Sequence, residues 1–349
     1  MAEPPSRLAK RHEIKRNRYR ERSMLLAGDV GGTKTRLGLF EPHGKTTKRL
    51  AVERYESGKF DSLEEIIKTF LDQHKARPKV ACFGIPGPVI EGRVKVTNLP
   101  WELSERSISD SLDIPKVKLV NDLVATAAAI PAFTEKEILT LHRGNPPVGD
   151  GVAAVVAPGT GLGQAFLYQD GGRNYFLASE GGHSNFAPTN EIEFELHAFI
   201  TRRYGHASVE RVLCGPGLVN IYEFLKEGGH AEEPLELSEK MRTELPTAVI
   251  ASTGQEGTYP ITKMALEMFI SILGAHASNV MITVLATKGV YLGGGIPPRI
   301  IEKLQEGGIM KSYLDKGKMA RQVEAAPLHV IKDDHAALLG AAEIAFSLS

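Results

Sequence analysis

A carboxylate and an amide lie together at the end of an apolar run. Asn121 and Asp122 directly follow residues 117–120, which have the composition of a buried strand. A carboxylate within hydrogen-bonding reach can take a proton from a substrate hydroxyl, so Asp122 is a candidate general base. A helical pattern follows, so the alternative is that Asp122 caps the helix. The amide of Asn121 can both donate and accept hydrogen bonds, which favours a ligand rich in hydroxyl groups, such as a sugar.

A second polar cluster spans residues 179–183, where Glu180 and His183 are separated by two glycines. Carboxylate and imidazole groups together suit a small polar ligand such as a hexose, and no further ligands at a suitable spacing indicate a metal site. The alternative is a capped turn. Residues 227–230 repeat the same four residue types, but they follow a helical pattern, so we assign His230 and its glycines to a helix end at the surface.

Three glycine loops each follow an apolar run, at residues 28–34, 158–163 and 293–296. Glycine lets the backbone approach a ligand closely, and its N–H groups can bind phosphate. Apolar alternation follows the first two loops and predicts β-hairpins, which excludes both the P-loop and the Rossmann fingerprint, since each needs a helix there. The third loop leads into a helix near residue 297. One such loop could be an ordinary turn, but three in this order indicate an ATP-dependent phosphotransferase.

The periodicity predicts an α/β arrangement that would position these groups. Ligands of such sheets bind outside the carboxyl ends of the strands, where Asn121 and Asp122 are expected. Two loosely similar halves suggest a duplicated unit, and the polar stretch 227–258 is expected at the surface. We predict hairpins at 25–40 and 152–168, strands at 52–55, 80–85 and 117–120, and helices at 62–71, 123–130, 190–203, 216–226, 262–286 and 336–346.

Length and composition favour an ordinary globular protein. The chain has 349 residues, which suggests two domains, with 42% apolar and 24% charged residues. Its formal net charge is zero, so no global field attracts nucleic acid or a membrane. Cys82 and Cys214 are isolated, as in a reducing, intracellular compartment. We expect no membrane span, because no apolar run approaches about 20 residues.

The first 23 residues form a basic extension with eight Lys/Arg and three acidic residues, a net charge of +5. Its near lack of apolar side chains predicts a disordered tail. A translation start at Met24 is an alternative. A basic nucleic-acid arm or a transit peptide is the least favoured alternative, and the three acids and only two serines argue against the transit peptide.

Taken together, the motifs resemble the bacterial glucokinase family from about Met24 to the C-terminus. The segment from Glu210 to Asn220 is especially distinctive. The resemblance rests on residues 28–33, 97–101, 120–122, 159–163, 180–183, 210–220 and 292–295.

This resemblance implies the two-domain α/β fold of the actin and hexokinase ATPase superfamily, a ribonuclease H-like, actin-like ATPase fold with a cleft between domains. We expect a smaller domain at 24–132 plus 333–349, with the last helix packed on it, and a larger domain at 133–332. The implied reaction transfers phosphate from ATP to the C6 hydroxyl of glucose, giving glucose 6-phosphate and ADP in glycolysis. Mg²⁺ as cofactor, a homodimer and a cytoplasmic location are also implied.

The resemblance also assigns roles to particular residues. Asp122 would be the catalytic base, and Asp29 would hold Mg²⁺ directly or through water. ATP would contact Gly28, Asp29, Val30, Gly31, Gly32, Thr33, Gly159, Thr160, Gly161, Gly293, Gly294 and Gly295. The sugar would contact Asn98, Asn121, Asp122, Glu180, His183 and Glu210.

Two departures keep alternatives open. Lys34 stands where many family members have asparagine, and the related ROK sugar kinases often have lysine there. ROK kinases usually carry a cysteine-rich zinc motif after the Glu-x-Gly-His segment, whereas residues 184–188 contain no cysteine, which favours glucokinase. A ROK-type kinase for another hexose is the nearest alternative. A sugar-sensing regulator would need an N-terminal helix-turn-helix, which 23 residues cannot hold, and a filament or chaperone member would not need the sugar residues.

Overall fold

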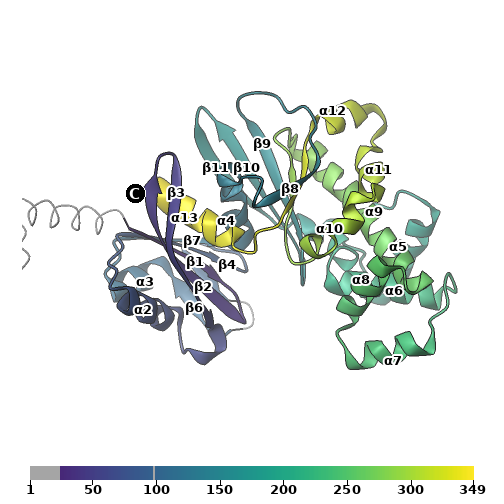
Figure 1. The fold of residues 1–349 in the computed structure, drawn as a ribbon, viewed down its shortest axis with the longest axis horizontal. Coiled ribbons are helices and arrows are strands. Elements are labelled where there is room, and N and C mark those ends of the chain that lie inside the picture. The colour runs from purple at the N-terminus through teal and green to yellow at the C-terminus, as the bar shows by residue number, and fades with distance from the viewer. Residues whose placement is uncertain (1–23, 97–98) are drawn as a thin grey trace, which may run out of the picture. The chain divides into compact units, whose positions relative to one another are not determined.

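A computed structural model describes residues 24–96 and 99–349 of the chain, which form two compact units (Figure 1). The first unit comprises the described residues up to Phe133 together with Asp334–Ser349, and the second is Thr134–Asp333. The predictions made for residues 1–23 and for Asn98 lie outside the described residues.

The first unit is built on a five-stranded sheet of order β3-β2-β1-β4-β7. Strands β1, β2 and β3 form an antiparallel meander, and β4 and β7 run parallel to β1. The predicted first hairpin and the strands at 80–85 and 117–120 are therefore confirmed. The strands are β1 (Leu25–Val30), β2 (Lys34–His43), β3 (Thr46–Glu56), β4 (Val80–Ile85), β5 (Arg93–Lys95), β6 (Glu102–Ser104) and β7 (Lys116–Asn121), and the helices are α2 (Leu63–His74), α3 (Glu105–Leu112), α4 (Asp122–Ala128) and α13 (Ala336–Leu348).

Helix α2 begins where the sequence predicts it. The Ser62 hydroxyl accepts a hydrogen bond from the Glu65 amide at 3.2 Å, which satisfies one of the amides that a helix start leaves free. The apolar face of α2 includes Ile66 and Phe70, which are fully buried in a core shared with β1, β2 and β4. Burial of that face, rather than helix propensity, stabilises the helix.

The last helix, α13, packs on the first unit, as the resemblance implied (Figure 1). A Cβ atom on Gly340 would lie only 1.7 Å from the Ala125 carbonyl oxygen, so glycine permits the close approach of α13 to α4. At the hairpin between β2 and β3, Glu343 accepts hydrogen bonds from Thr46 Oγ1 at 2.6 Å and from the Thr47 amide at 2.9 Å. These contacts hold the C-terminal helix against the hairpin between β2 and β3.

The second unit is built on a six-stranded sheet of order β11-β10-β9-β12-β13-β8. Here too an antiparallel meander (β9, β10, β11) is extended by parallel strands (β12, β13), and β8 is added antiparallel at the far edge. The strands are β8 (Ile138–His142), β9 (Gly151–Pro158), β10 (Leu162–Asp170), β11 (Arg173–Ser179), β12 (Val290–Leu292) and β13 (Leu328–Ile331), and the helices are α5 (Glu191–Tyr204), α6 (Gly215–Glu227), α7 (Leu235–Thr243), α8 (Pro246–Glu256), α9 (Pro260–Val284), α10 (Ile301–Gln305), α11 (Gly308–Leu314) and α12 (Ala320–Ala325).

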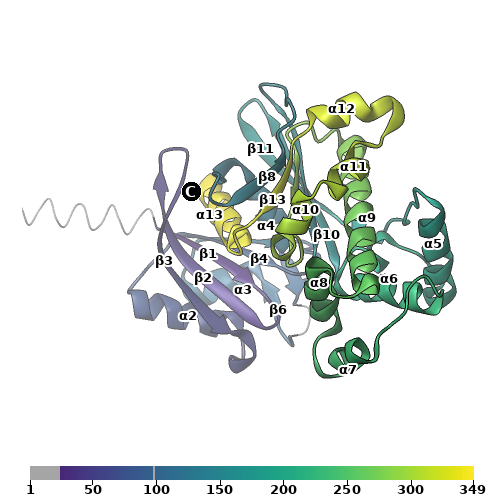
Figure 2. The same cartoon turned by 45° about the vertical axis from the view of Figure 1, so that its right-hand side comes forward.

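The stretch 227–258 was expected to be a surface segment, and this expectation is wrong in part. It contains helices α7 and α8, and α8 packs against α9 (Figure 2). Val249 and Ile250 of α8 are fully buried in the core of the second unit. Only a few apolar positions of these short helices face inward, and most of their other residues are polar, which obscures the helical pattern in the sequence.

Helix α9 corrects the expectation that no apolar run is long enough to cross a membrane. It has 25 residues, and its most apolar window has a mean hydropathy of 1.4. That window is 78% buried inside the unit, where α9 packs against α6, α8 and α11. A core helix surrounded by other helices has the same composition as a membrane span, because both are apolar on every side.

Candidate functional site

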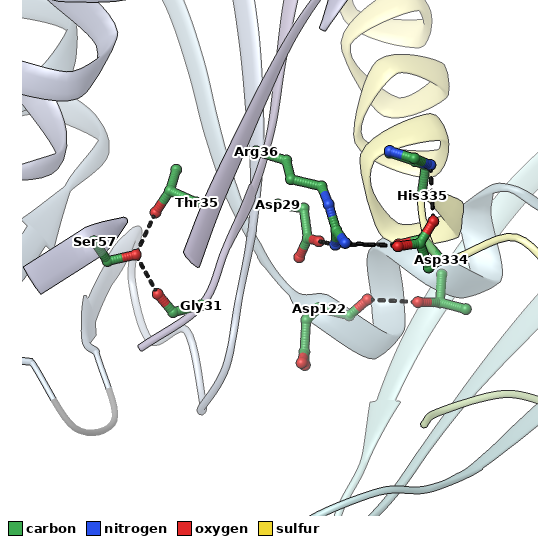
Figure 3. A network of polar contacts seen from close by, with 9 residues as sticks. Asp29, Gly31, Thr35, Arg36, Ser57, Asp122, Asp334 and His335 are labelled. Atoms are coloured by element: carbon green, nitrogen blue, oxygen red, sulfur yellow. Dashed lines mark hydrogen bonds and ion pairs between the residues drawn. The ribbon is translucent and has the colours of Figure 1, made fainter. Parts of the chain in front are cut away.

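Two carboxylates of the first unit lie at one edge of its sheet (Figure 3). Asp29 is near the end of β1, and Asp122 directly follows β7. Because β1, β4 and β7 are parallel, their carboxyl ends meet at the same edge. Burial, together with the negative charge of Asp29, raises the pKa of Asp122 to about 6. A carboxyl group that titrates near neutral pH is suited to transferring a proton.

The structure assigns the helix cap to Asn121 and not to Asp122. Asn121 Oδ1 accepts hydrogen bonds from the amides of Leu123 at 2.9 Å and Val124 at 3.4 Å, and its Nδ2 donates to the Gly87 carbonyl at 3.3 Å. The alternative interpretation of Asp122 as the N-cap is therefore wrong: Asp122 is the first residue of α4. The Asn121 side chain thus holds the start of α4 through Oδ1 and contacts Gly87 through Nδ2, and its contact with a sugar stays a prediction.

Arg36 completes this group, although no sequence motif singled it out. Its Nη1 donates to Asp29 Oδ2 at 3.3 Å and to the Asp334 carbonyl at 3.2 Å, and its Nη2 donates to Asp334 Oδ2 at 2.7 Å (Figure 3). Burial nevertheless outweighs the attraction of Arg36 and raises the pKa of Asp29. The ion pair between Asp29 and Arg36 could have been predicted from the sequence, because the two residues are opposite each other in the hairpin of β1 and β2.

The first glycine loop is a tight turn between β1 and β2. The Gly31 amide donates to the Lys34 carbonyl at 2.9 Å, and Ser57 holds the loop from the side: its Oγ donates to the Gly31 carbonyl at 2.7 Å and its amide donates to the Thr33 carbonyl at 3.0 Å (Figure 3). A strand follows the loop, as predicted. Lys34, which departs from the family pattern, is exposed.

The second and third glycine loops lie side by side in the second unit, because β9 and β12 are parallel neighbours. The second loop closes with a hydrogen bond from the Gly159 amide to the Gly161 carbonyl at 2.8 Å. The third is attached to β9, since the Gly293 amide donates to the Val156 carbonyl at 2.9 Å and the Ile296 amide donates to the Pro158 carbonyl at 3.3 Å. The two loops thus form one glycine-rich edge.

Three predicted sugar residues meet beside the second loop. His183 Nε2 lies 3.8 Å from Glu180 Oε2, and its Nδ1 lies 4.0 Å from Glu210 Oε1. Glu210 Oε2 accepts a hydrogen bond from the Leu162 amide at 2.8 Å. A Cβ atom on Gly161 would lie 2.6 Å from that same oxygen, so glycine leaves room for this carboxylate. Two acidic side chains and an imidazole, all partly exposed, offer the mixed hydrogen-bonding groups that a polyhydroxyl ligand needs.

The repeated motif at 227–230 has a different setting. Helix α6 ends at Glu227, and Gly229 has a φ of +69°, so the predicted helix end is confirmed. His230 Nε2 lies 3.2 Å from Glu195 Oε2, and its ring centroid is 4.9 Å from that of Phe224. The His230 side chain is 25% exposed, so it is half-buried against this helix rather than fully at the surface.

The acidic side chain at the end of β1 has the right chemistry for a divalent cation. Mg²⁺ prefers carboxylate oxygens and is usually held by one or two of them together with substrate phosphates and water. The Asp29 side chain is 23% exposed and lies next to the first glycine loop, so an oxygen ligand adjoins the backbone that we predict to bind phosphate. The residues present therefore fit Mg²⁺.

These two sheets, each a meander extended by parallel strands, define a two-domain α/β kinase of the actin-like ATPase class. A sequence model of the glucokinase family matches residues 26–347. A glucokinase of a Nostoc species is 35% identical over 336 residues, which cover 92% of this chain and 98% of that protein. The chain belongs to the glucokinase family.

Solved structures agree with this assignment. The crystal structure of a glucokinase from an Antarctic psychrotroph has a TM-score of 0.84 and 26% identity, covering 93% of this chain and 99% of that one. A ROK-family glucokinase from Streptomyces griseus, in complex with glucose and AMPPNP, has a TM-score of 0.58 and 18% identity, covering 93% of this chain and 99% of that one. The second comparison bears on the fold alone.

Proposed function

We propose that this protein is a glucokinase that transfers the γ-phosphoryl group of ATP to the C6 hydroxyl of glucose, giving glucose 6-phosphate and ADP. The observation that carries the proposal is Asp122, a half-buried carboxylate at the end of β7 whose pKa is raised to about 6. Membership of the glucokinase family supports the choice of sugar and of nucleotide.

Asp122 is proposed as the general base. At pH 7 a carboxyl with a pKa of about 6 is mostly ionised and is still more basic than an ordinary aspartate. It can accept the hydroxyl proton as the phosphoryl group is transferred, and it aligns the attacking oxygen. Asn121, with its amide engaged at the start of α4, is proposed to hold Asp122 in position.

The glycine loops are proposed to bind ATP. The backbone of residues 28–33 and of residues 159–161 would meet the phosphates, and residues 293–295 would meet the adenosine. Asp29 would hold Mg²⁺, directly or through water, and the ion would neutralise charge on the phosphates. AMPPNP in the Streptomyces griseus protein, a relative in fold, is consistent with ATP as donor.

For the sugar we propose hydrogen bonds from Asp122 in the first unit and from Glu180, His183 and Glu210 in the second. Asn98 stays a proposal based on the resemblance alone. We also propose that the protein is a homodimer and that it acts in cytoplasmic glycolysis, both on the basis of the family resemblance. Sedimentation of the purified protein tests the dimer.

A coupled assay for ADP release, run over a panel of hexoses with and without Mg²⁺, tests the proposal. We expect turnover with glucose and ATP, and none after chelation of Mg²⁺. Faster turnover with another hexose would favour the ROK-type alternative, to which Lys34 points. Sugar binding without ADP release would identify a sensor instead.

A further inference from the structure

A cavity of about 320 Å³ lies within the second unit, behind the segments that carry its three proposed sugar residues. Each of these residues has a sequence neighbour in the cavity wall. Ser179 precedes Glu180, Ser184 follows His183, and Val209 precedes Glu210. The three sugar residues themselves are not among the described residues that line it.

Within the cavity wall, the segment that follows His183 is hydrogen-bonded to the segment that precedes Glu210. The Val209 amide donates to the Ser184 carbonyl at 2.9 Å, and the Phe186 amide donates to the Ala207 carbonyl at 2.9 Å. Asn185 and Ser208 pair between them as an antiparallel bridge. A displacement of this short ladder would therefore move His183 and Glu210 together.

One side of the cavity is polar. Gln164 Nε2 lies 2.7 Å from His276 Nε2, and because an amide nitrogen only donates, the ring nitrogen is the acceptor. Burial lowers the pKa of His276 to about 4, which keeps the ring neutral and able to accept. The Gln164 Oε1 atom lies 2.2 Å from the place that a Cβ of Gly181 would take, so Gln164 contacts the turn that carries His183.

The rest of the lining is mainly apolar and includes Phe166, Phe186, Ile272 and Val280. An apolar cavity of about 150 Å³ holds one benzene ring, so a space of this size suits a molecule of about two rings. Apolar walls with a few converging polar groups are typical of small-molecule sites. The lining also includes the carboxylate of Glu193, whose Oε2 accepts from the Thr189 amide and hydroxyl and whose Oε1 accepts from Asn190 Nδ2, so it is engaged within its own segment. The neutral imidazole and the amides of Gln164 and Asn279 suit an uncharged hydrogen-bonding group on the ligand.

We propose that this cavity binds a small, uncharged, two-ring molecule with one hydrogen-bonding group, and that its occupancy changes the affinity for the sugar. The proposal that the cavity binds such a molecule depends only on the shape and lining of the cavity. The regulatory part rests on the proposed function, since it requires that Glu180, His183 and Glu210 bind the sugar.

Indole, which has two rings and one N–H donor, is the probe. Its binding to the full-length protein is followed by titration calorimetry and by saturation-transfer NMR. Ala275→Leu, on α9, fills the cavity, and Ala198→Leu, on α5, is the matched control, because Ala198 lines a different cavity of about 340 Å³ in the same unit. Thr283→Leu, at an exposed position of the cavity lining, is a second variant with less risk to folding.

We expect saturable binding of indole to the wild type and to Ala198→Leu, and binding weakened about tenfold or more in Ala275→Leu and Thr283→Leu. With indole bound, the KM for glucose should change about fivefold or more while the KM for ATP stays constant. Equal binding to all four proteins, or none to the wild type, would overturn the proposed site.

The remaining outcomes separate the two proposals. Indole binding by a protein without hexokinase activity would leave the site standing and refute the proposed function. Binding with an unchanged KM for glucose would refute the regulatory part. A dimer that excludes indole and is lost in Ala275→Leu would show that the cavity receives a second copy of the chain, which would also overturn the proposal.

Discussion

The two units share a sheet plan but build their polar groups in different environments. In the first unit, Asp29 and Asp122 are half-buried at the sheet edge, and burial raises the pKa of both. In the second unit, the side chains of Glu180 and His183 are 75% and 64% exposed. A proton-transferring group benefits from a shifted pKa, whereas groups that only hydrogen-bond to a sugar do not need one. The comparison therefore matches the roles proposed above, proton transfer in the first unit and sugar recognition in the second.

The strongest test of this separation is Asp122→Asn. Loss of a general base is expected to lower kcat about 10²–10⁴-fold, with little change in the KM for ATP. ADP release measures the effect. Asp110→Asn, at an exposed aspartate of α3 in the same unit, is the control and should retain wild-type turnover. A kcat for Asp122→Asn within a few-fold of wild type would contradict the assignment of the base.

Arg36→Met tests whether the half-buried charge of Asp29 depends on its counter-ion. It leaves Asp29 and Asp334 without the guanidinium, and we expect the free energy of unfolding to fall by about 2–3 kcal/mol. The pKa of Asp29 should rise further, because the attraction of Arg36 lowers it. Urea denaturation measures the stability.

Arg106→Met is the matched control for this variant. Arg106 forms an exposed pair with Asp110 on α3, so its loss should cost no more than about 0.5 kcal/mol. Equal destabilisation by the two substitutions would show that the Arg36 contacts are worth no more than a surface ion pair.

The raised pKa of Asp122 predicts opposite effects of pH on activity and on stability. A base must be ionised, so kcat/KM should fall as the pH drops through about 6. The folded state binds this proton more tightly than the unfolded state, so the contribution to stability is present below about pH 4 and is lost as the pH rises through about 6. Asp122→Asn removes the buried charge and should raise the unfolding free energy at pH 8 by on the order of 2 kcal/mol.

This gain should vanish near pH 3.5, where wild-type Asp122 is protonated as well. Denaturation curves of both proteins at the two pH values give the comparison. A variant that is less stable than wild type at pH 8 would mean that the charge of Asp122 is satisfied in the fold, contrary to the raised pKa.

The smallest effect is expected in the exposed cluster of the second unit. His183→Ala should raise the KM for glucose about fivefold to tenfold, because one hydrogen bond to the sugar is lost in a partly solvated place. His230→Ala, in the repeated motif just after α6, should leave that KM unchanged. Steady-state kinetics with varied glucose compare the two variants. Equal effects on the KM for glucose would show that the four-residue motif itself, and not its structural setting, determines whether the histidine binds the sugar.

Local patterns explain why much of the fold could be predicted. The two glycine hairpins, the Ser62 cap of α2 and the buried strand 80–85 depend on residues close in sequence. The helices α7 and α8 were missed because only a few of their positions face the core. Cys214 is a free cysteine, as predicted, and it has a further role that the sequence did not indicate: it caps α6, with the Gly217 amide donating to its sulfur at 3.2 Å.

The sequence by itself determined the hairpin loops, the order of the elements and the position of Asp122 after a strand, since spacing and turn chemistry act over a few residues. Only the tertiary structure decided which groups meet. Arg36 and Asp334 are 298 residues apart in the chain, and the walls of the cavity behind His183 come from segments as distant as Gln164 and His276. Tertiary packing also raised the pKa of Asp122 through burial and the nearby charge of Asp29. Burial and long-range charge exist only once the sheet and its helices have packed, so no local pattern records them.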